Sequence, residues 1–178
     1  MSDLTGKRVL IVIAYQDFQD HEFKPVHDYL SMLGAHIRIA SSSLGTATGK
    51  FGMHVDIDLL FSDVRTEYYD ALVVIGGPGA VELRENHFLT EIIHNLYTAK
   101  KIVAAICIAP TILARAGILK GKKATVWTPG PESETVQSLT SAGAKYHDQP
   151  VVIDGRIITA NGPEAAHDFA HAIADKLD

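Results

Sequence analysis

Three short apolar runs, each followed by a loop and then a helix-forming stretch, constrain the fold of this chain most strongly. The runs are residues 9–14, 71–75 and 102–106. An unbroken apolar run of this length is typical of a strand that is buried on both faces. Strands that alternate with helices predict an α/β fold with a doubly wound, mostly parallel sheet that is sandwiched by helices. In such folds, ligands bind outside the carboxyl ends of the strands.

Periodicity and turn residues predict the remaining elements. We expect strands at 36–40 and 124–126, a hairpin or extended excursion at 46–58, a hairpin at 151–159, and helices at 22–33, 88–99, 110–116, 132–142 and 163–177. Pro25 would lie in the first turn of the helix predicted at 22–33, where proline is tolerated. The chain shows no internal repeat, low-complexity segment or linker, so we expect a single domain over residues 1–178.

Composition excludes several classes of protein. Hydrophobic residues make up 47% and charged residues 21%, which is ordinary globular usage. The net charge of −5 gives no electrostatic signature for binding nucleic acid. No apolar run approaches the roughly 20 residues of a membrane helix. A single cysteine excludes an intrachain disulfide, and the first residues lack an apolar signal core, so we expect a cytoplasmic protein.

The only cysteine, Cys107, ends the run 102–106 and comes just before Ala109-Pro110 and a helix. A direct turn from strand to helix places this side chain at the carboxyl edge of the sheet, exposed and facing backbone amides at the helix N-terminus. We expect strained backbone angles there. The amides and the helix dipole favour a thiolate, so we expect a pKa below the ordinary value of about 8.5. The alternative is a buried structural cysteine.

Glu22 is the second candidate, because it lies four residues before Val26 on the apolar stripe of its helix. A carboxylate on an inward face is costly unless it is paired or protonated, so we expect its pKa to be raised. Such a group can donate a proton or act as a general base. The alternative is a solvent-facing residue that interacts with the helix dipole.

Three further features near this edge carry weaker signals. Gly76-Gly77-Pro78-Gly79 follows the second apolar run, and glycine N–H groups can form an oxyanion hole, although a simple tight turn is the alternative. His21 is a candidate base for Cys107. The alternative is a solvent-facing histidine, because position 21 points about 100° around the helix from position 22. His167 and His171 have the spacing of a zinc helix but no third ligand, so we expect no metal.

The combined motifs resemble the PfpI/DJ-1 superfamily, over essentially the whole chain and in the same order. The matching stretches are Phe18–Phe23, Gly76–Gly79, Ala105–Pro110 and Ala160–Pro163. The resemblance implies a flavodoxin-like sandwich of the class I glutamine amidotransferase type, assembled as a homodimer or a larger ring. It also implies chemistry without a cofactor.

By this resemblance, Cys107 is the nucleophile at the elbow and Glu22 is the acid beside its sulfur. The N–H groups of Gly77 and Ile108 line the oxyanion pocket, and we expect Gly76 to contribute to it. PfpI-type members carry a histidine directly after the cysteine, where this chain has Ile108. A Cys-His-acid peptidase needs such a base, so we expect no peptidase activity.

Two other positions depart from the family pattern and are further candidates for the pocket. A histidine of DJ-1-type members falls at Trp127, and an arginine of DJ-1 itself falls at Asn161. The carboxylate that PfpI-type members lend across a subunit interface falls near Val81.

The sequence leaves several functions open. The first is a glyoxalase or deglycase, in which Cys107 adds to a small reactive carbonyl and Glu22 shuttles the proton. The second is a redox-sensing stress-response protein, in which Cys107 oxidises to a sulfinate. A PfpI-type peptidase or amidase and an isonitrile hydratase are the remaining alternatives.

Overall fold

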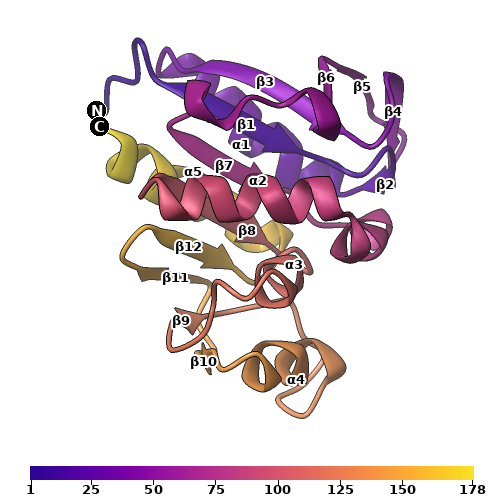
Figure 1. Ribbon diagram of the computed structural model, residues 1–178, viewed down its shortest axis with the longest axis vertical. Coiled ribbons are helices and arrows are strands. Elements are labelled where there is room, and N and C mark those ends of the chain that lie inside the picture. The colour runs from indigo at the N-terminus through magenta and orange to yellow at the C-terminus, as the bar shows by residue number, and fades with distance from the viewer.

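A seven-stranded sheet runs through the computed structural model, which describes residues 1–178 (Figure 1). In spatial order its strands are β11 (Val151–Asp154), β12 (Ile157–Ala160), β8 (Ile102–Ile106), β7 (Ala71–Val74), β1 (Arg8–Val12), β3 (His36–Ser41) and β6 (Leu59–Leu60). All neighbouring pairs are parallel except β11 with β12. The three apolar runs therefore form the adjacent strands β1, β7 and β8, as predicted.

Helices cover both faces of this sheet. Helix α2 (His87–Thr98) lies on one face, and helices α1 (Asp20–Met32) and α5 (Ala166–Leu177) pack against each other on the other face (Figure 1). Short helical turns are η1 (Phe61–Asp63), η2 (Thr66–Tyr68), η3 (Pro78–Glu85) and η4 (Pro163–Ala165). The predicted doubly wound α/β sandwich is confirmed.

Two small sheets lie outside the main one. Strands β2 (Gln16–Phe18), β4 (Gly45–Gly49) and β5 (His54–Ile57) form the first, and β4 and β5 are the expected hairpin. Strands β9 (Lys123–Ala124) and β10 (Lys145–Tyr146) form the second, near α3 (Pro110–Arg115) and α4 (Glu134–Ser141). The strand expected at 124–126 is therefore shorter and displaced by one residue, because the Thr125 N–H donates to the Thr159 side chain at 2.9 Å and not to the backbone of a neighbouring strand.

Helix α1 begins earlier than the sequence predicts. Gln19 caps it, since the Gln19 side chain accepts a hydrogen bond of 3.2 Å from the His21 N–H group. Pro25 therefore lies in the second turn and not in the first. Proline cannot donate to the carbonyl of His21, but that residue is exposed, so water can satisfy the carbonyl.

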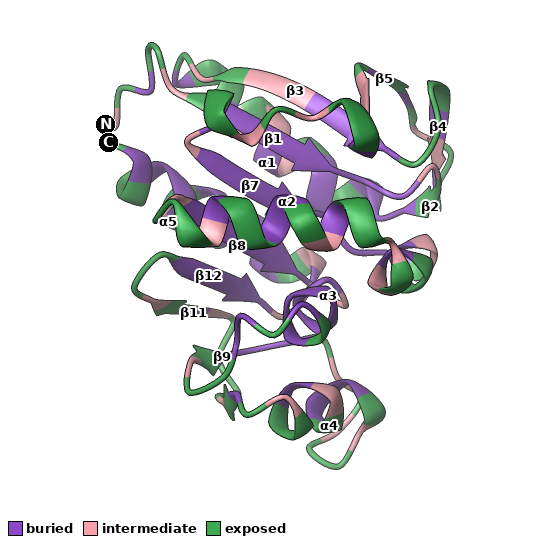
Figure 2. Cartoon of the chain, viewed as in Figure 1, coloured by how far each residue is buried: buried purple, intermediate pink, exposed green.

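The core lies on both faces of the central strands, which Figure 2 shows as almost wholly buried. Every residue of β7 and β8 is buried, which explains the unbroken apolar runs. None of the helices has both the length and the apolar character that crossing a membrane requires. Because β7, β8 and β12 are neighbouring parallel strands, their carboxyl ends lie together at one edge of the sheet.

Candidate active site

Cys107 occupies the corner between β8 and α3 with a backbone φ of 65°. Positive φ is uncommon for a non-glycine residue and persists only where the surroundings enforce it. Here the Cys107 N–H donates to the Ala160 carbonyl at 2.9 Å, and the Cys107 carbonyl accepts from the Trp127 N–H at 2.8 Å. The strained corner is confirmed, although the side chain is half-buried and not fully exposed.

Glu22 points inward from the first turn of α1 and is 0% exposed. Its Oε2 accepts a hydrogen bond of 2.9 Å from the Gly76 N–H, whereas Oε1 is buried and makes no hydrogen bond of standard geometry. Burial raises the pKa of Glu22 to about 7, and hydrogen bonds from Gly76 and from the Cys107 thiol oppose that rise. The inward orientation and raised pKa agree with the prediction, and the solvent-facing alternative is wrong.

Gly76 provides the space in which these two side chains meet. A Cβ atom at this position would lie 2.7 Å from Cys107 Cβ and 3.0 Å from Glu22 Oε2. Contacts that short do not occur in relaxed structures, so only glycine fits here. The Gly76 N–H is engaged by Glu22 and is not directed to an oxyanion, contrary to expectation. Its role is to hold the carboxyl group in place.

Gly77 brings the start of α1 onto the loop that follows β7. Its φ is +110°, and a Cβ atom there would lie 2.5 Å from both Asp17 O and Gln19 N. The Gln19 N–H also donates to the Gly76 carbonyl at 3.0 Å. Close backbone approach of this kind requires glycine. Because Gln19 caps α1, this contact fixes the position of Glu22 relative to β7.

Several groups shift the pKa of the Cys107 thiol, and they act in opposite directions. Burial raises its pKa most, and the negative charge of Glu22 and the hydrogen bond to it raise it further. Hydrogen bonds from the N–H groups of Ile108 and Gly77 lower it, as expected of amides that line an oxyanion pocket. The net direction is upward, so the predicted lowering is wrong. Helix α3 has only six residues and contributes a short dipole, whereas Glu22 is a full charge when ionised.

The remaining candidates lie in different places. His21 is exposed, and its ring packs on Phe51 with 4.8 Å between centroids, which supports the solvent-facing alternative. The Trp127 indole is 44% exposed and lies beside Gly162, with Cδ1 3.6 Å from the position of a Cβ there. Asn161 is half-buried and directly follows the carbonyl that binds the Cys107 N–H. Trp127 and Asn161 therefore flank the cysteine, and His21 does not.

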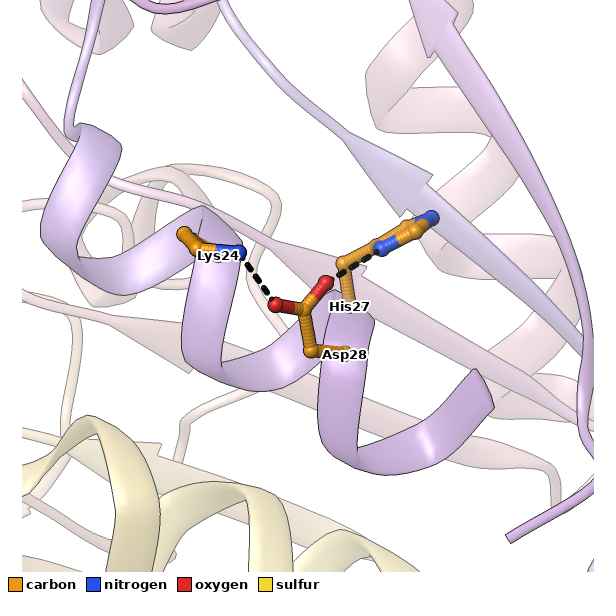
Figure 3. Close-up of polar contacts among 3 residues, drawn as sticks. All are labelled: Lys24, His27 and Asp28. Atoms are coloured by element: carbon orange, nitrogen blue, oxygen red, sulfur yellow. Dashed lines mark hydrogen bonds and ion pairs between the residues drawn. The ribbon is translucent and has the colours of Figure 1, made fainter. Parts of the chain in front are cut away.

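A surface groove of about 960 Å³ is separate from Cys107 and Glu22, neither of which lines it. It lies along the outer face of α1, which carries the ion pair of Lys24 with Asp28 at 2.5 Å (Figure 3). Hydrogen bonds from Lys24 and then His27 lower the pKa of Asp28. This surface and the cysteine site are thus on different faces of the same helix.

Sequence reasoning missed the groups that hold the elbow. The Ala160 carbonyl and the Trp127 amide are backbone groups, which carry no residue-type signal. Thr111 was also missed: it is fully buried, and its Oγ1 donates to the Ile108 carbonyl at 2.6 Å. Its signal would have been a hydroxyl residue within the otherwise apolar start of a helix.

Known proteins match this chain over nearly its whole length. Deglycase PfpI of Pyrococcus furiosus is 34% identical over 154 residues, which cover 86% of this chain and 90% of that protein. The glutathione-independent glyoxalase DJR-1.2 of Caenorhabditis elegans is 29% identical over 172 residues, which cover 97% of this chain and 89% of that protein.

Solved structures and a family profile agree with these matches. The crystal structure of a ThiJ/PfpI domain protein from Brachyspira murdochii superposes with a TM-score of 0.91 and 33% identity, covering 97% of this chain and 96% of that one. The sequence profile of the DJ-1/PfpI family matches residues 7–176. The resemblance seen in the sequence is confirmed, and the chain belongs to the DJ-1/PfpI family.

Proposed function

We propose that this protein converts small reactive carbonyls without a cofactor, as a glyoxalase or deglycase, with Cys107 as the nucleophile. The names of the two relatives, a deglycase and a glyoxalase, support this class of activity. The observation that carries the proposal is the buried Glu22 carboxyl beside the Cys107 sulfur, with its pKa raised to about 7. A carboxyl group with such a pKa can both take up and release a proton near neutral pH.

In the first step, the Cys107 sulfur adds to the aldehyde carbon of a 2-oxoaldehyde such as methylglyoxal. A C–S bond forms, and the π electrons of the carbonyl move to its oxygen. The N–H groups of Gly77 and Ile108, which already interact with the sulfur, are placed to stabilise that oxygen. Glu22 accepts the thiol proton and delivers it to the oxygen, so the product is a hemithioacetal.

In the second step, Glu22 removes the proton from the hemithioacetal carbon, and a proton is returned to the neighbouring carbonyl carbon. The product is a thioester of a 2-hydroxy acid. Water then cleaves the C–S bond, releasing the hydroxy acid and the thiol. One carbon is oxidised and its neighbour is reduced within the same molecule, so the reaction needs no external oxidant or reductant.

A substrate panel tests this proposal. Wild type, Cys107→Ser and Glu22→Gln are assayed with methylglyoxal, glyoxal, a peptide and an isonitrile. We expect turnover of the two dicarbonyls in wild type and its loss in both variants. His21→Gln is the matched control, because His21 neighbours Glu22 in sequence but faces solvent. Dicarbonyl turnover that persists in Cys107→Ser would contradict the proposed nucleophile.

A redox role for Cys107 is the second candidate, and the same two amides support it. The N–H groups of Gly77 and Ile108 could hold the oxygens of a sulfinate. Mass spectrometry after peroxide treatment tests this role, with Met32, whose side chain is 65% exposed, as the internal comparison. Oxidation of Cys107 before Met32, together with no turnover of any panel substrate, would favour the redox role.

The expected homo-oligomer stays a prediction, and light scattering on the purified chain tests it. The isonitrile and peptide arms of the panel test the other two chemistries. The residue directly after Cys107 is Ile108 and not a histidine, so the chain offers no base at that position for either chemistry.

A further inference from the structure

Thr111 is hydrogen-bonded to both segments that supply amide donors at Cys107. Its Oγ1 donates to the Ile108 carbonyl at 2.6 Å and accepts from Arg84 Nε at 2.9 Å. Thr111 is fully buried, and Arg84 is half-buried. Arg84 belongs to η3, the turn that starts directly after Gly77. One hydroxyl group therefore bridges the Gly77 side and the Ile108 side of the pocket.

The peptide groups around Ile108 are held on both sides. The Ile108 carbonyl accepts from the Thr111 N–H at 3.0 Å in addition to the hydroxyl, and the Cys107 carbonyl accepts from the Trp127 N–H at 2.8 Å. In a trans peptide the carbonyl and the N–H of one plane point in opposite directions. The Ile108 N–H is therefore directed away from Trp127, and it interacts with the Cys107 sulfur.

The Gly77 side is equally constrained. The Ala80 N–H donates to the Gly77 carbonyl at 3.0 Å, which fixes Gly77 as the first residue outside η3. Any movement of η3 relative to α3 would therefore change the separation of the two N–H donors. The bond between Arg84 and Thr111 opposes that movement from within the protein.

We propose that Thr111, anchored by Arg84, is a positioning residue that sets the orientation and spacing of the Gly77 and Ile108 N–H groups. This inference deepens the proposed function, on which its consequences for turnover rest. Its consequences for the reactivity of the Cys107 thiol do not depend on any substrate.

The chain offers a matched control between the same two segments. Glu85 and Arg115 form an ion pair that also joins η3 to α3, but their side chains are 71% and 58% exposed. Exposed ion pairs contribute little to stability. Loss of the buried Thr111 hydroxyl, in contrast, leaves the Arg84 donor without its partner in a partly buried place, which is costly.

The experiment compares Thr111→Val, Thr111→Ser and the control Glu85→Gln. Two quantities are measured: the rate of Cys107 alkylation by iodoacetamide as a function of pH, and kcat and KM for methylglyoxal. Removal of one oxyanion donor costs about 10²–10³ in kcat, so displacement of a donor by Thr111→Val should cost about tenfold, with KM changed less than about twofold. The alkylation profile should move to higher pH, because the Ile108 and Gly77 amides lower the thiol pKa.

Thr111→Ser keeps the hydroxyl and should match wild type, as should Glu85→Gln. A folded Thr111→Val with the wild-type alkylation profile would overturn the inference. If that variant does not fold, Arg84→Met replaces it in the test, because it removes the donor to Thr111 and keeps the aliphatic stem. An unchanged alkylation profile in Arg84→Met would also overturn the inference. A shifted profile without methylglyoxal turnover in wild type would defeat the proposed function and leave this inference standing.

Discussion

Glu22 and Cys107 converge on Gly76, where a Cβ atom would lie 2.7 Å from Cys107 Cβ and 3.0 Å from Glu22 Oε2. The two side chains come from segments far apart in sequence, one at the start of α1 and the other at the end of β8. Because they are close, Glu22 raises the pKa of the Cys107 thiol further, and the hydrogen bond from that thiol opposes the rise that burial causes in the pKa of Glu22. The following predictions depend on this contact.

Gly76→Ala should destabilise the protein and abolish turnover. The added methyl group would clash with Cys107 Cβ and also lie 2.9 Å from the Ile106 carbonyl, which cannot move without disturbing β8. Overpacking of this kind costs about 1–3 kcal/mol. Urea unfolding measures the loss. Gly130→Ala is the control, because nothing lies within 4 Å of a Cβ there, and its free energy of unfolding should change by less than about 0.5 kcal/mol. Equal stability of the two variants would refute the close contact.

Stability should depend on pH through Glu22. Its pKa is about 7 in the folded protein against 4.5 for an unperturbed glutamate, so the unfolded chain releases this proton at lower pH. The contribution of Glu22 is therefore fully present below about pH 4.5 and is lost as pH rises to about 7, at a cost of up to about 3 kcal/mol. Glu22→Gln cannot titrate. The difference in unfolding free energy between wild type and Glu22→Gln should fall over this window, and a constant difference would be incompatible with a buried, titrating Glu22.

Alkylation of Cys107 should report the ionisation of Glu22. When Glu22 is ionised, its charge raises the pKa of the thiol, so Glu22→Gln should react faster with iodoacetamide at about pH 8. Wild type should show two inflections, because coupled groups lose their protons in two macroscopic steps. Glu22→Gln should show one. The same profile in both proteins would mean that the two groups do not interact.

Peptide hydrolysis should be undetectable in wild type, because it needs both a base for the thiol and an acid for the leaving amine, and Ile108 stands where a histidine would supply one of them. General acid–base help is worth about 10² to 10⁴ in rate, so carbonyl turnover with Glu22 alone should be slow. Ile108→His adds an imidazole where PfpI-type members carry one and should raise the carbonyl rate. Robust peptidase activity in wild type that Cys107→Ala abolishes would point to a histidine from a second subunit.

Much of the fold and part of the site follow from local sequence. The apolar runs 9–14, 71–75 and 102–106 predicted the adjacent strands, because a strand buried on both faces must be apolar throughout. The position of Glu22 on the stripe of its helix predicted its burial, because helical periodicity fixes which face a residue occupies. These properties depend on neighbours within a few residues, so the sequence alone determined them.

Only the tertiary structure decided the electrostatics and the donors of the site. The pKa of Cys107 rises first because the thiol is buried and then because Glu22, from another segment, lies beside it, and no local pattern around the cysteine reveals either cause. The hydrogen bond from the Gly76 N–H to Glu22 and the packing of His21 on Phe51 likewise join segments that are distant in sequence. A hydrogen bond needs heavy atoms about 3 Å apart, and the Coulomb interaction of two charges weakens as their distance grows. The sequence does not state which distant segments come close enough for either.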